Sequence, residues 1–123
     1  MTQRQNADGN CQRSLCPVAC TLDIIGDKWT LLVVRDLFSG KKMYSEFQRS
    51  PEKIPSNILA DRLKRLVEYK IVLKEPYQTH PIRYQYALTK KGRELRLVLK
   101  AMVQWGEKNI PGSKALIKSI ENA

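Results

Sequence analysis

Hydrophobic residues in the early part of the chain recur at intervals of three and four, which is the spacing of helices that bury one side. Pro17 and Gly26 bracket the first such run, since proline suits the first turn of a helix and glycine suits its end. The second run begins after Asp27, a good N-cap residue, and stops at Gly40. Because this second run is apolar on nearly every side, we expect it to form a central, buried helix.

The middle of the chain contains the pattern of a short helix and then a longer one. Residues 41–50, KKMYSEFQRS, predict a turn and a short helix with Phe47 inward and Ser45 as its cap. The longer helix extends from Pro55 to about Tyr69. At about 100° per residue, its apolar residues share one side: Leu59, Leu63, Leu66 and Val67. The opposite side is polar and consists of Asn57, Asp61, Lys64 and Glu68, with Arg65 nearby.

The period of the pattern changes after this helix. Residues 71–76 begin with two β-branched residues and residues 83–89 alternate between apolar and polar, so we predict a β-hairpin with residues 77–82 as its loop. Thr89 then suits the cap of a long amphipathic helix over residues 90–109. The apolar positions of that helix follow the helical spacing: Leu95, Val98, Leu99, Met102 and Trp105.

The two ends of the chain differ from its middle. We expect residues 1–14 to form a disordered arm and residues 15–110 to form the folded domain. A Pro-Gly pair ends the long helix, and residues 111–123 are predicted to form a short last helix that contributes a dimer contact. The apolar residues of this last helix are Leu116, Ile117 and Ile120.

Two short helices followed by a β-hairpin are typical of a winged helix-turn-helix. We therefore predict an α+β fold that is mostly helical, with the hairpin as the wing and helical dimerisation elements at both ends. In this fold SNILADRLKRL, residues 56–66, is the second helix of the helix-turn-helix. Its polar side is then expected to face the major groove of DNA.

The net charge of the chain points to a partner. Lys and Arg number 22 against 12 Asp and Glu, which gives +10 on 123 residues. This excess favours a polyanion, with nucleic acid first and an anionic membrane second. No apolar run approaches the roughly 18 residues of a membrane span, and the N-terminal MTQRQNADGN lacks the apolar stretch of a signal peptide. We therefore expect a cytoplasmic protein without a membrane partner.

Several motifs resemble those of one family. They are CPV, then IGDKWTLLVVRDLFSGKKMYSEF, then IP..IL..RLKRLVEYKIV, then YQTHPIRYQYALTKKG, and a Trp near the end of the long helix. Over about residues 15–107 the chain resembles the HxlR-type winged helix-turn-helix transcriptional regulators, which are relatives of the MarR repressors. The resemblance implies a homodimer on a pseudo-palindromic operator, joined through the first helix and the long C-terminal helix. It also implies sensing of oxidants or electrophiles by the cysteine of the CP motif, here Cys16.

Two positions depart from the pattern of the family. Typical members have Ser-Pro where this chain has Pro55-Ser56, which leaves the start of the recognition helix open. They often have Asp-Gly where this chain has Tyr69-Lys70, so we expect a tighter or less regular turn into the first strand of the wing.

Polar residues of the helix-turn-helix and the wing are candidate DNA contacts. Asn can bind adenine through two hydrogen bonds, Lys can reach guanine, and a carboxylate can accept from cytosine. The candidate base-reading residues are Ser56, Asn57, Asp61, Lys64 and Arg65. The candidate contacts to the sugar-phosphate backbone, including those of the wing, are Lys41, Lys42, Ser45, Arg49, Lys74 and Arg83. The ordinary alternative is a solvated surface, and Asp61 has the further alternatives of repelling phosphate or pairing with Lys64 or Arg65.

Three cysteines, Cys11, Cys16 and Cys20, lie near the N-terminus, and their odd number argues against a disulfide framework. Cys16 precedes Pro17 at a predicted helix start, where partial positive charge favours the reactive thiolate. The alternative for Cys16 is a small packed residue. The three cysteines with His80 would make four zinc ligands, but the spacing fits no common zinc site. We expect no metal or other cofactor, and we expect His80 to hydrogen-bond locally within the wing.

We interpret the sequence as that of a sequence-specific regulator that binds double-stranded DNA, acts as a repressor and responds to an oxidant or a small-molecule effector. The alternative is a non-catalytic winged-helix module that binds RNA or another protein. An enzyme is not expected, because the chain has no carboxylate pair, Gly-rich phosphate loop or Ser/His/Asp arrangement. A thiol enzyme would need a base near its cysteine, whereas His80 is predicted to lie in the wing.

Overall fold

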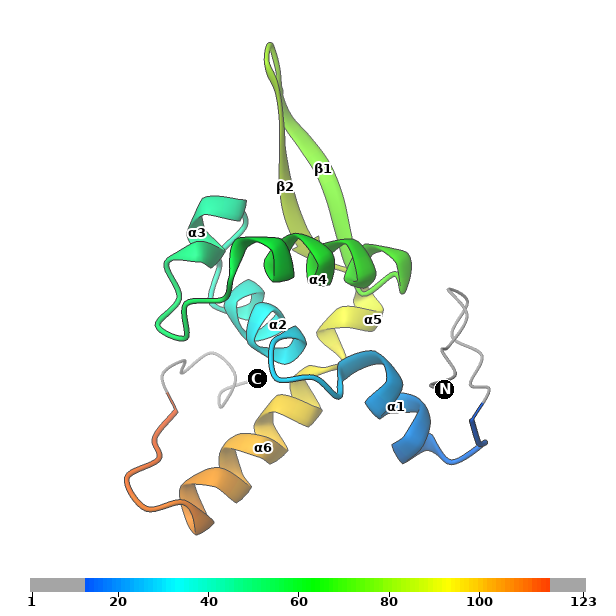
Figure 1. Ribbon diagram of the computed structural model, residues 1–123, viewed down its shortest axis with the longest axis vertical. Coiled ribbons are helices and arrows are strands. Elements are labelled where there is room, and N and C mark those ends of the chain that lie inside the picture. The colour runs from blue at the N-terminus through cyan, green and yellow to red at the C-terminus, as the bar shows by residue number, and fades with distance from the viewer. Residues whose placement is uncertain (1–12, 116–123) are drawn as a thin grey trace.

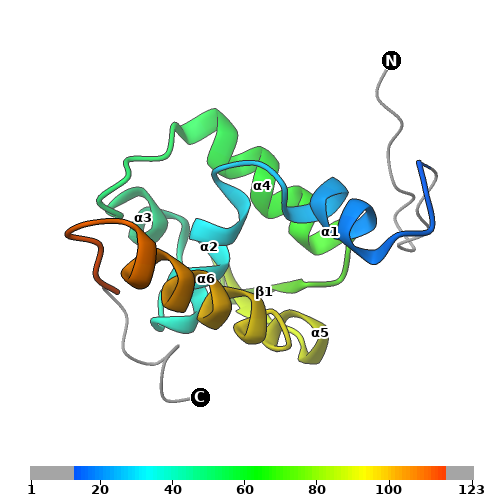
Figure 2. The same cartoon turned by 90° about the horizontal axis from the view of Figure 1, so that it is seen from below.

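A computed structural model describes residues 13–115 as a helical body from which one β-hairpin projects (Figure 1). In chain order the elements are α1 (Pro17–Ile25), α2 (Thr30–Phe38), α3 (Tyr44–Gln48), α4 (Ser56–Glu68), β1 (Val72–Thr79), β2 (Ile82–Leu88), α5 (Lys90–Arg93) and α6 (Arg96–Asn109). Seen from below, α6 crosses beneath α2 while α1 lies to one side (Figure 2). The predicted mixed fold with a two-stranded wing is confirmed.

The α1–α2 turn is organised by one carboxylate. Asp27 accepts hydrogen bonds from the backbone N–H groups of Trp29 and Thr30, at 3.1 and 3.2 Å. Asp27 therefore caps this turn, as predicted, although α2 begins only at Thr30. The centre of α2 is buried, with Val33 and Val34 almost fully removed from solvent, which confirms its predicted central place.

The short helix α3 is capped by a different residue from the one predicted. The carboxylate of Glu46 accepts from the backbone N–H groups of Lys42 and Met43, both at 2.9 Å. These hydrogen bonds stabilise the charged form and lower the pKa of Glu46. Ser45 lies inside α3 and is exposed, so its predicted role as the cap was wrong. A carboxylate at the third helical position reaches back to the N–H groups at and before the N-cap, as in the reverse half of a capping box.

The hydrophobic core joins α2, α3, α4 and the base of the wing. Leu59, Leu63 and Leu66 of α4 face inward, which confirms the predicted buried side of this helix. Phe47 of α3 is fully buried, and its ring meets that of Tyr86 on β2 edge to face, with 6.3 Å between centroids. The core therefore ties the helix-turn-helix to the wing.

The wing is longer than predicted, and its turn is shorter. Strands β1 and β2 pair antiparallel from Val72 and Leu88 to Thr79 and Ile82, which leaves two residues at the tip instead of the six-residue loop 77–82. The register shifts just after Pro76, so a bulge accommodates the proline, which cannot donate to the ladder. The prediction ended the first strand too early, because a proline such as Pro76 is typical of the end of a strand.

The turn from α4 into β1 is a regular helix ending. Lys70 has a φ of 62°, and the N–H of Ile71 bonds to the carbonyl of Leu66 at 2.9 Å. The N–H of Lys70 bonds to Val67 at 3.0 Å, which completes a Schellman motif. The less regular turn expected at Tyr69-Lys70 was wrong, although a lysine has to adopt the left-handed conformation there.

The helix predicted over residues 90–109 is two helices. Thr89 caps α5 as predicted, accepting from the N–H of Gly92 at 3.0 Å. The Thr89 hydroxyl also donates to Lys70, and Lys91 donates to the carbonyl of Tyr69, so α5 is bound to the α4–β1 connection. A side chain at Gly92 would clash with the carbonyl of Ile71. Two turn residues, Glu94 and Leu95, separate α5 from α6.

The apolar end of the chain, with Leu116, Ile117 and Ile120 of the predicted last helix, lies outside the described residues. Within residues 13–115, no helix is long and apolar enough to cross a membrane.

Candidate nucleic-acid interface

The exposed side of α4 presents the residues predicted to read bases. Asn57, Asp61 and Lys64 are all exposed, opposite the buried leucines of the same helix. The wing rises from behind α4, and a short connector joins α3 to the start of α4 (Figure 1). Two helices joined by a turn and flanked by a hairpin are the arrangement in which the second helix enters the major groove.

Ser56, the first residue of α4, is held by α3. The Tyr44 hydroxyl lies 2.6 Å from the carbonyl oxygen of Ser56 and 2.8 Å from its Oγ. Pro55 is in extended conformation and directly precedes the helix, so the helix start that the sequence left open at Pro55-Ser56 is Ser56.

Asp61 pairs with Arg62, a residue that the sequence did not single out. Arg62 Nη1 donates to Asp61, and Arg62 Nε donates to Asp27 Oδ2 at 2.8 Å. Partial burial alone would raise the pKa of Asp27, but hydrogen bonds from Thr30 and Arg62 outweigh it and bring the pKa to about 2. The α1–α2 turn is thereby joined through Arg62 to the exposed side of α4.

Arg65 lies on the flank of α4 that faces α1. It is partly buried, and its Nη2 donates to the carbonyl of Asp23 at 3.4 Å. The structure therefore places Arg65 against α1 and leaves Ser56, Asn57, Asp61 and Lys64 on the open part of the helix.

Among the candidate backbone contacts before α4, Lys42, Ser45 and Arg49 are exposed. Lys41 is partly buried, and its Nζ lies 2.8 Å from Ser50 Oγ and 3.7 Å from an oxygen of Asp36. Lys41 is therefore a member of a protein network, while the other three side chains remain open to solvent.

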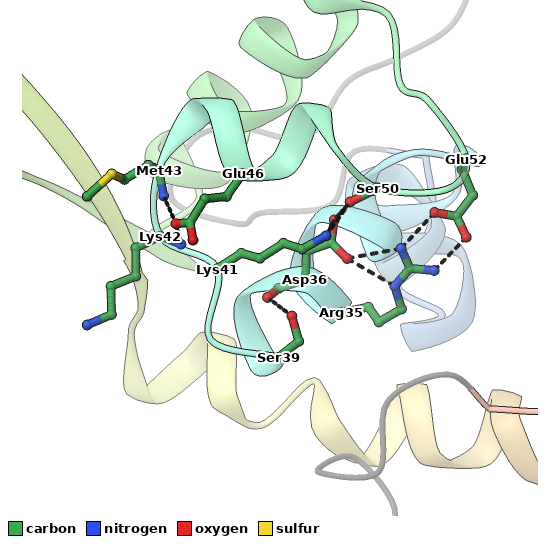
Figure 3. A network of polar contacts seen from close by, with 9 residues as sticks. All are labelled: Arg35, Asp36, Ser39, Lys41, Lys42, Met43, Glu46, Ser50 and Glu52. Atoms are coloured by element: carbon green, nitrogen blue, oxygen red, sulfur yellow. Dashed lines mark hydrogen bonds and ion pairs between the residues drawn. The ribbon is translucent and has the colours of Figure 1, made fainter.

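That network has a buried carboxylate at its centre (Figure 3). Asp36 accepts from Ser50 through one oxygen and from Arg35 Nη2, at 3.0 Å, through the other. Arg35 also binds both oxygens of Glu52 at 2.7 Å, and this pairing is the main cause that raises its pKa. The network joins the end of α2 to the connector between α3 and α4. Sequence reasoning missed it, because its members are spread over 18 positions of α2 and the connector.

The wing presents cations on an aromatic surface. Lys74 Nζ lies 4.4 Å above the ring centre of Tyr84, a cation–π distance. Arg83 on β2 is exposed and opposes Gln78. His80 is exposed at the tip, where the Gln78 side chain donates to its carbonyl at 3.4 Å. The wing therefore holds two of the candidate backbone contacts, Lys74 and Arg83, in accessible positions.

Cys16 lies just before α1 and is exposed, with a free thiol. Hydrogen bonds from the backbone N–H groups of Ala19 and Val18 stabilise its thiolate and lower the pKa of Cys16, as predicted for a helix start. Cys20 is disulfide-bonded, which corrects the expectation that this chain would have no structural disulfide. Cys11 lies outside the described residues.

A second exposed surface is apolar and lies on the side of the molecule away from the wing. A cavity of about 560 Å³ opens between α1, α2 and α6. Its apolar lining includes Val18, Leu22, Leu31, Leu32, Val98 and Met102. Val18 is 67% exposed and Met102 54% exposed, and Trp105 on the next turn of α6 is 64% exposed. Side chains of this size are seldom left in water as one contiguous surface.

The alternative of a zinc site finds no set of ligands in the part of the chain that the structure describes. No three His, Cys, Asp or Glu side chains gather there to hold a metal ion. His80 lies at the wing tip, at the far end of the molecule from α1 (Figure 1).

The order α3, α4 and hairpin, with an exposed polar side on α4, defines a winged helix-turn-helix protein. Residues 24–114 match the model of the HxlR-like helix-turn-helix family. The chain belongs to this family, whose members are HTH-type transcriptional regulators.

Three relatives illustrate the similarity. YdeP of Bacillus subtilis (strain 168), an uncharacterized HTH-type transcriptional regulator, is 40% identical over 93 residues, which cover 76% of this chain and 73% of YdeP. The crystal structure of PA1607 is 42% identical and has a TM-score of 0.75, covering 85% of this chain and 73% of that one. The redox regulator HypR in its oxidized form is 38% identical and has a TM-score of 0.69, covering 76% of this chain and 97% of HypR.

Proposed function

We propose that this regulator binds a specific double-stranded DNA operator as a homodimer and represses transcription by occupying it. The observation that supports this most directly is the exposed polar side of α4, with Asn57 and Lys64, beside a wing that presents Lys74 and Arg83. Asn and Lys are suited to base edges in the major groove, while cations on a wing suit phosphates. The net charge of +10 adds a general attraction to DNA.

The apolar surface around α1 and α6 supports the homodimer. A second copy placed on Val18, Leu22, Met102 and Trp105 would remove these exposed side chains from water. A two-fold axis through that surface would place two α4 helices on one face of the duplex, which suits a pseudo-palindromic operator.

Selection of bound fragments from a random duplex pool tests this function. We expect the recovered sites to contain two inverted half-sites about one helical turn apart, roughly 34–36 Å. Asn57→Ala should lose base preference at one position per half-site, a change of about 1–3 kcal/mol, because the amide can read adenine. Recovery of single half-sites would contradict the homodimer. Equal binding of all duplexes, or preference for single-stranded RNA, would favour the RNA-binding or protein-binding module.

We further propose that the regulator responds to oxidants or electrophiles through Cys16. The thiol is exposed, its pKa is lowered by the start of α1, and α1 belongs to the proposed dimer surface. Modification there would change how two copies pack, and hence the spacing of their α4 helices on DNA. HypR, a structural neighbour, is described as a redox regulator.

Labelling of thiols over a range of pH tests the role of Cys16. Because its pKa is lowered, the thiolate population persists to lower pH than in an ordinary cysteine, so labelling should remain fast below the usual value of about 8.5. An oxidant should release the operator from the native protein, while Cys16→Ser should bind DNA and ignore the oxidant. An oxidant response that survives Cys16→Ser would assign the sensing to another group or to a reversible small-molecule effector.

A further inference from the structure

Tyr44 and Ser56 join the first residue of α3 to the first residue of α4, the two helices of the helix-turn-helix. Tyr44 begins α3, and its ring packs against the hydrophobic core. Ser56 begins α4 and is exposed. The Tyr44 hydroxyl reaches both the carbonyl oxygen of Ser56, at 2.6 Å, and its side-chain hydroxyl, at 2.8 Å.

The chemistry of these groups determines which one donates. A carbonyl oxygen can only accept, so the short contact between Tyr44 and the Ser56 carbonyl requires the phenol to donate its single proton there. The Ser56 hydroxyl must then donate in the second contact, because the phenol has no other proton. The reverse assignment would place two oxygens 2.6 Å apart without a proton between them.

The proton of Ser56 is thus committed within the protein, and its Oγ offers only lone pairs to a partner. A free serine hydroxyl does not discriminate between bases in the major groove, since it can donate or accept a hydrogen bond. A hydroxyl restricted to accepting can bind the exocyclic amine of adenine or cytosine. It meets only acceptors on guanine O6 and N7 or on thymine O4.

We propose that Tyr44 is a specificity-determining residue, which makes Ser56 a reader of adenine or cytosine by holding its hydroxyl proton. Tyr44 acts through Ser56 and need not touch DNA itself. This inference rests on the proposed binding of α4 in the major groove. The packing of the Tyr44 ring against the core supports it, because this packing holds the phenol hydroxyl beside Ser56.

The test compares the full-length protein with Tyr44→Phe, Ser56→Ala and the double variant on sets of operator duplexes. Each set replaces one base pair by the other three. At one position per half-site, the native protein should prefer adenine or cytosine over guanine or thymine on one strand by about 5- to 10-fold, the worth of one hydrogen bond. Exchanging the two bases of the preferred pair between the strands should therefore weaken binding by the same factor.

Tyr44→Phe keeps the ring and its packing but frees the Ser56 proton. The preference at that position should fall to within about 2-fold, because the hydroxyl can then also donate to guanine or thymine. Ser56→Ala should flatten the same position, and the double variant should equal Ser56→Ala. Tyr77→Phe, which removes a phenol hydroxyl from the wing, is the matched control and should keep the preference at that position. Thermal melting of each variant tests whether the fold is retained.

The possible outcomes distinguish a failure of this inference from a failure of the proposed operator binding on which it rests. If Tyr44→Phe retains the adenine or cytosine preference at every position, or if Ser56→Ala changes no position, the assignment of Tyr44 is overturned while operator binding stands. If the native protein binds all duplexes equally, the proposed operator binding itself fails.

Discussion

The affinity of the protein for its operator is expected to fall by about 10³–10⁵-fold when salt is raised from roughly 50 to 200 mM. The physical reason is the release of cations from DNA when protein cations neutralise phosphates. Exposed cations flank α3, at Lys42 and Arg49, and others lie on the wing, at Lys74 and Arg83. We therefore expect the proposed dimer to neutralise about six to ten phosphates. A plot of the logarithm of affinity against the logarithm of salt concentration measures this number as its slope.

Two single-charge variants locate the cations responsible. Arg83→Ala should weaken binding to all duplexes similarly and reduce the slope by about one for each wing that contacts a phosphate. Lys108→Ala is the matched control, because Lys108 is exposed near the end of α6 away from α4 and the wing (Figure 1). An unchanged slope for Arg83→Ala, or equal effects of the two variants, would remove the wing from the DNA contact.

Replacement of Asp36 by alanine is expected to destabilise the protein by about 3–5 kcal/mol, the usual cost of removing one partner from a buried charged network. The carboxylate is buried, and it receives hydrogen bonds from Ser50 and Arg35. Without it, the buried hydroxyl of Ser50 and part of the Arg35 guanidinium lose their acceptor. Urea unfolding at one fixed protein concentration measures the change, because the stability of the proposed dimer would depend on concentration.

Glu52→Ala is the matched control for Asp36→Ala. Glu52 pairs with the same Arg35, but its side chain is about a third exposed, so its loss should cost only about 0.2–1 kcal/mol. Equal destabilisation by the two variants would mean that burial of Asp36 adds nothing to the strength of the network.

Local patterns predicted most of the helices and the wing, because each depends on residues that are close in sequence. The leucines at three- and four-residue spacing placed the buried side of α4 correctly. The same periodicity misled the prediction over residues 90–109, since apolar spacing continues through Leu95 although the chain bends there. The close approach of Gly92 in α5 to the carbonyl of Ile71, which lies 21 positions away, likewise has no local signal.

The candidate interface was predicted in part for the same reason. Helical spacing is enough to place Asn57 and Lys64 on an exposed side. It cannot predict that Lys41 turns toward Ser50 or that Arg62 pairs with Asp27, because those partners come together only in the folded chain. Arg62 lies between the two sides of α4, which is why a division into apolar and polar positions overlooked it.

The bridge from Asp27 through Arg62 has a mechanical consequence for a dimer built on α1. The guanidinium of Arg62, a residue of α4, donates both to Asp27 of the α1–α2 turn and to its neighbour Asp61 on α4. A displacement of that turn would act on α4 through this charge-assisted hydrogen bond of 2.8 Å. The Arg62–Asp27 ion pair thus couples the α1–α2 turn to α4. In a dimer joined through α1, a small change in the angle between the two subunits would therefore change the angle at which the paired α4 helices meet the DNA.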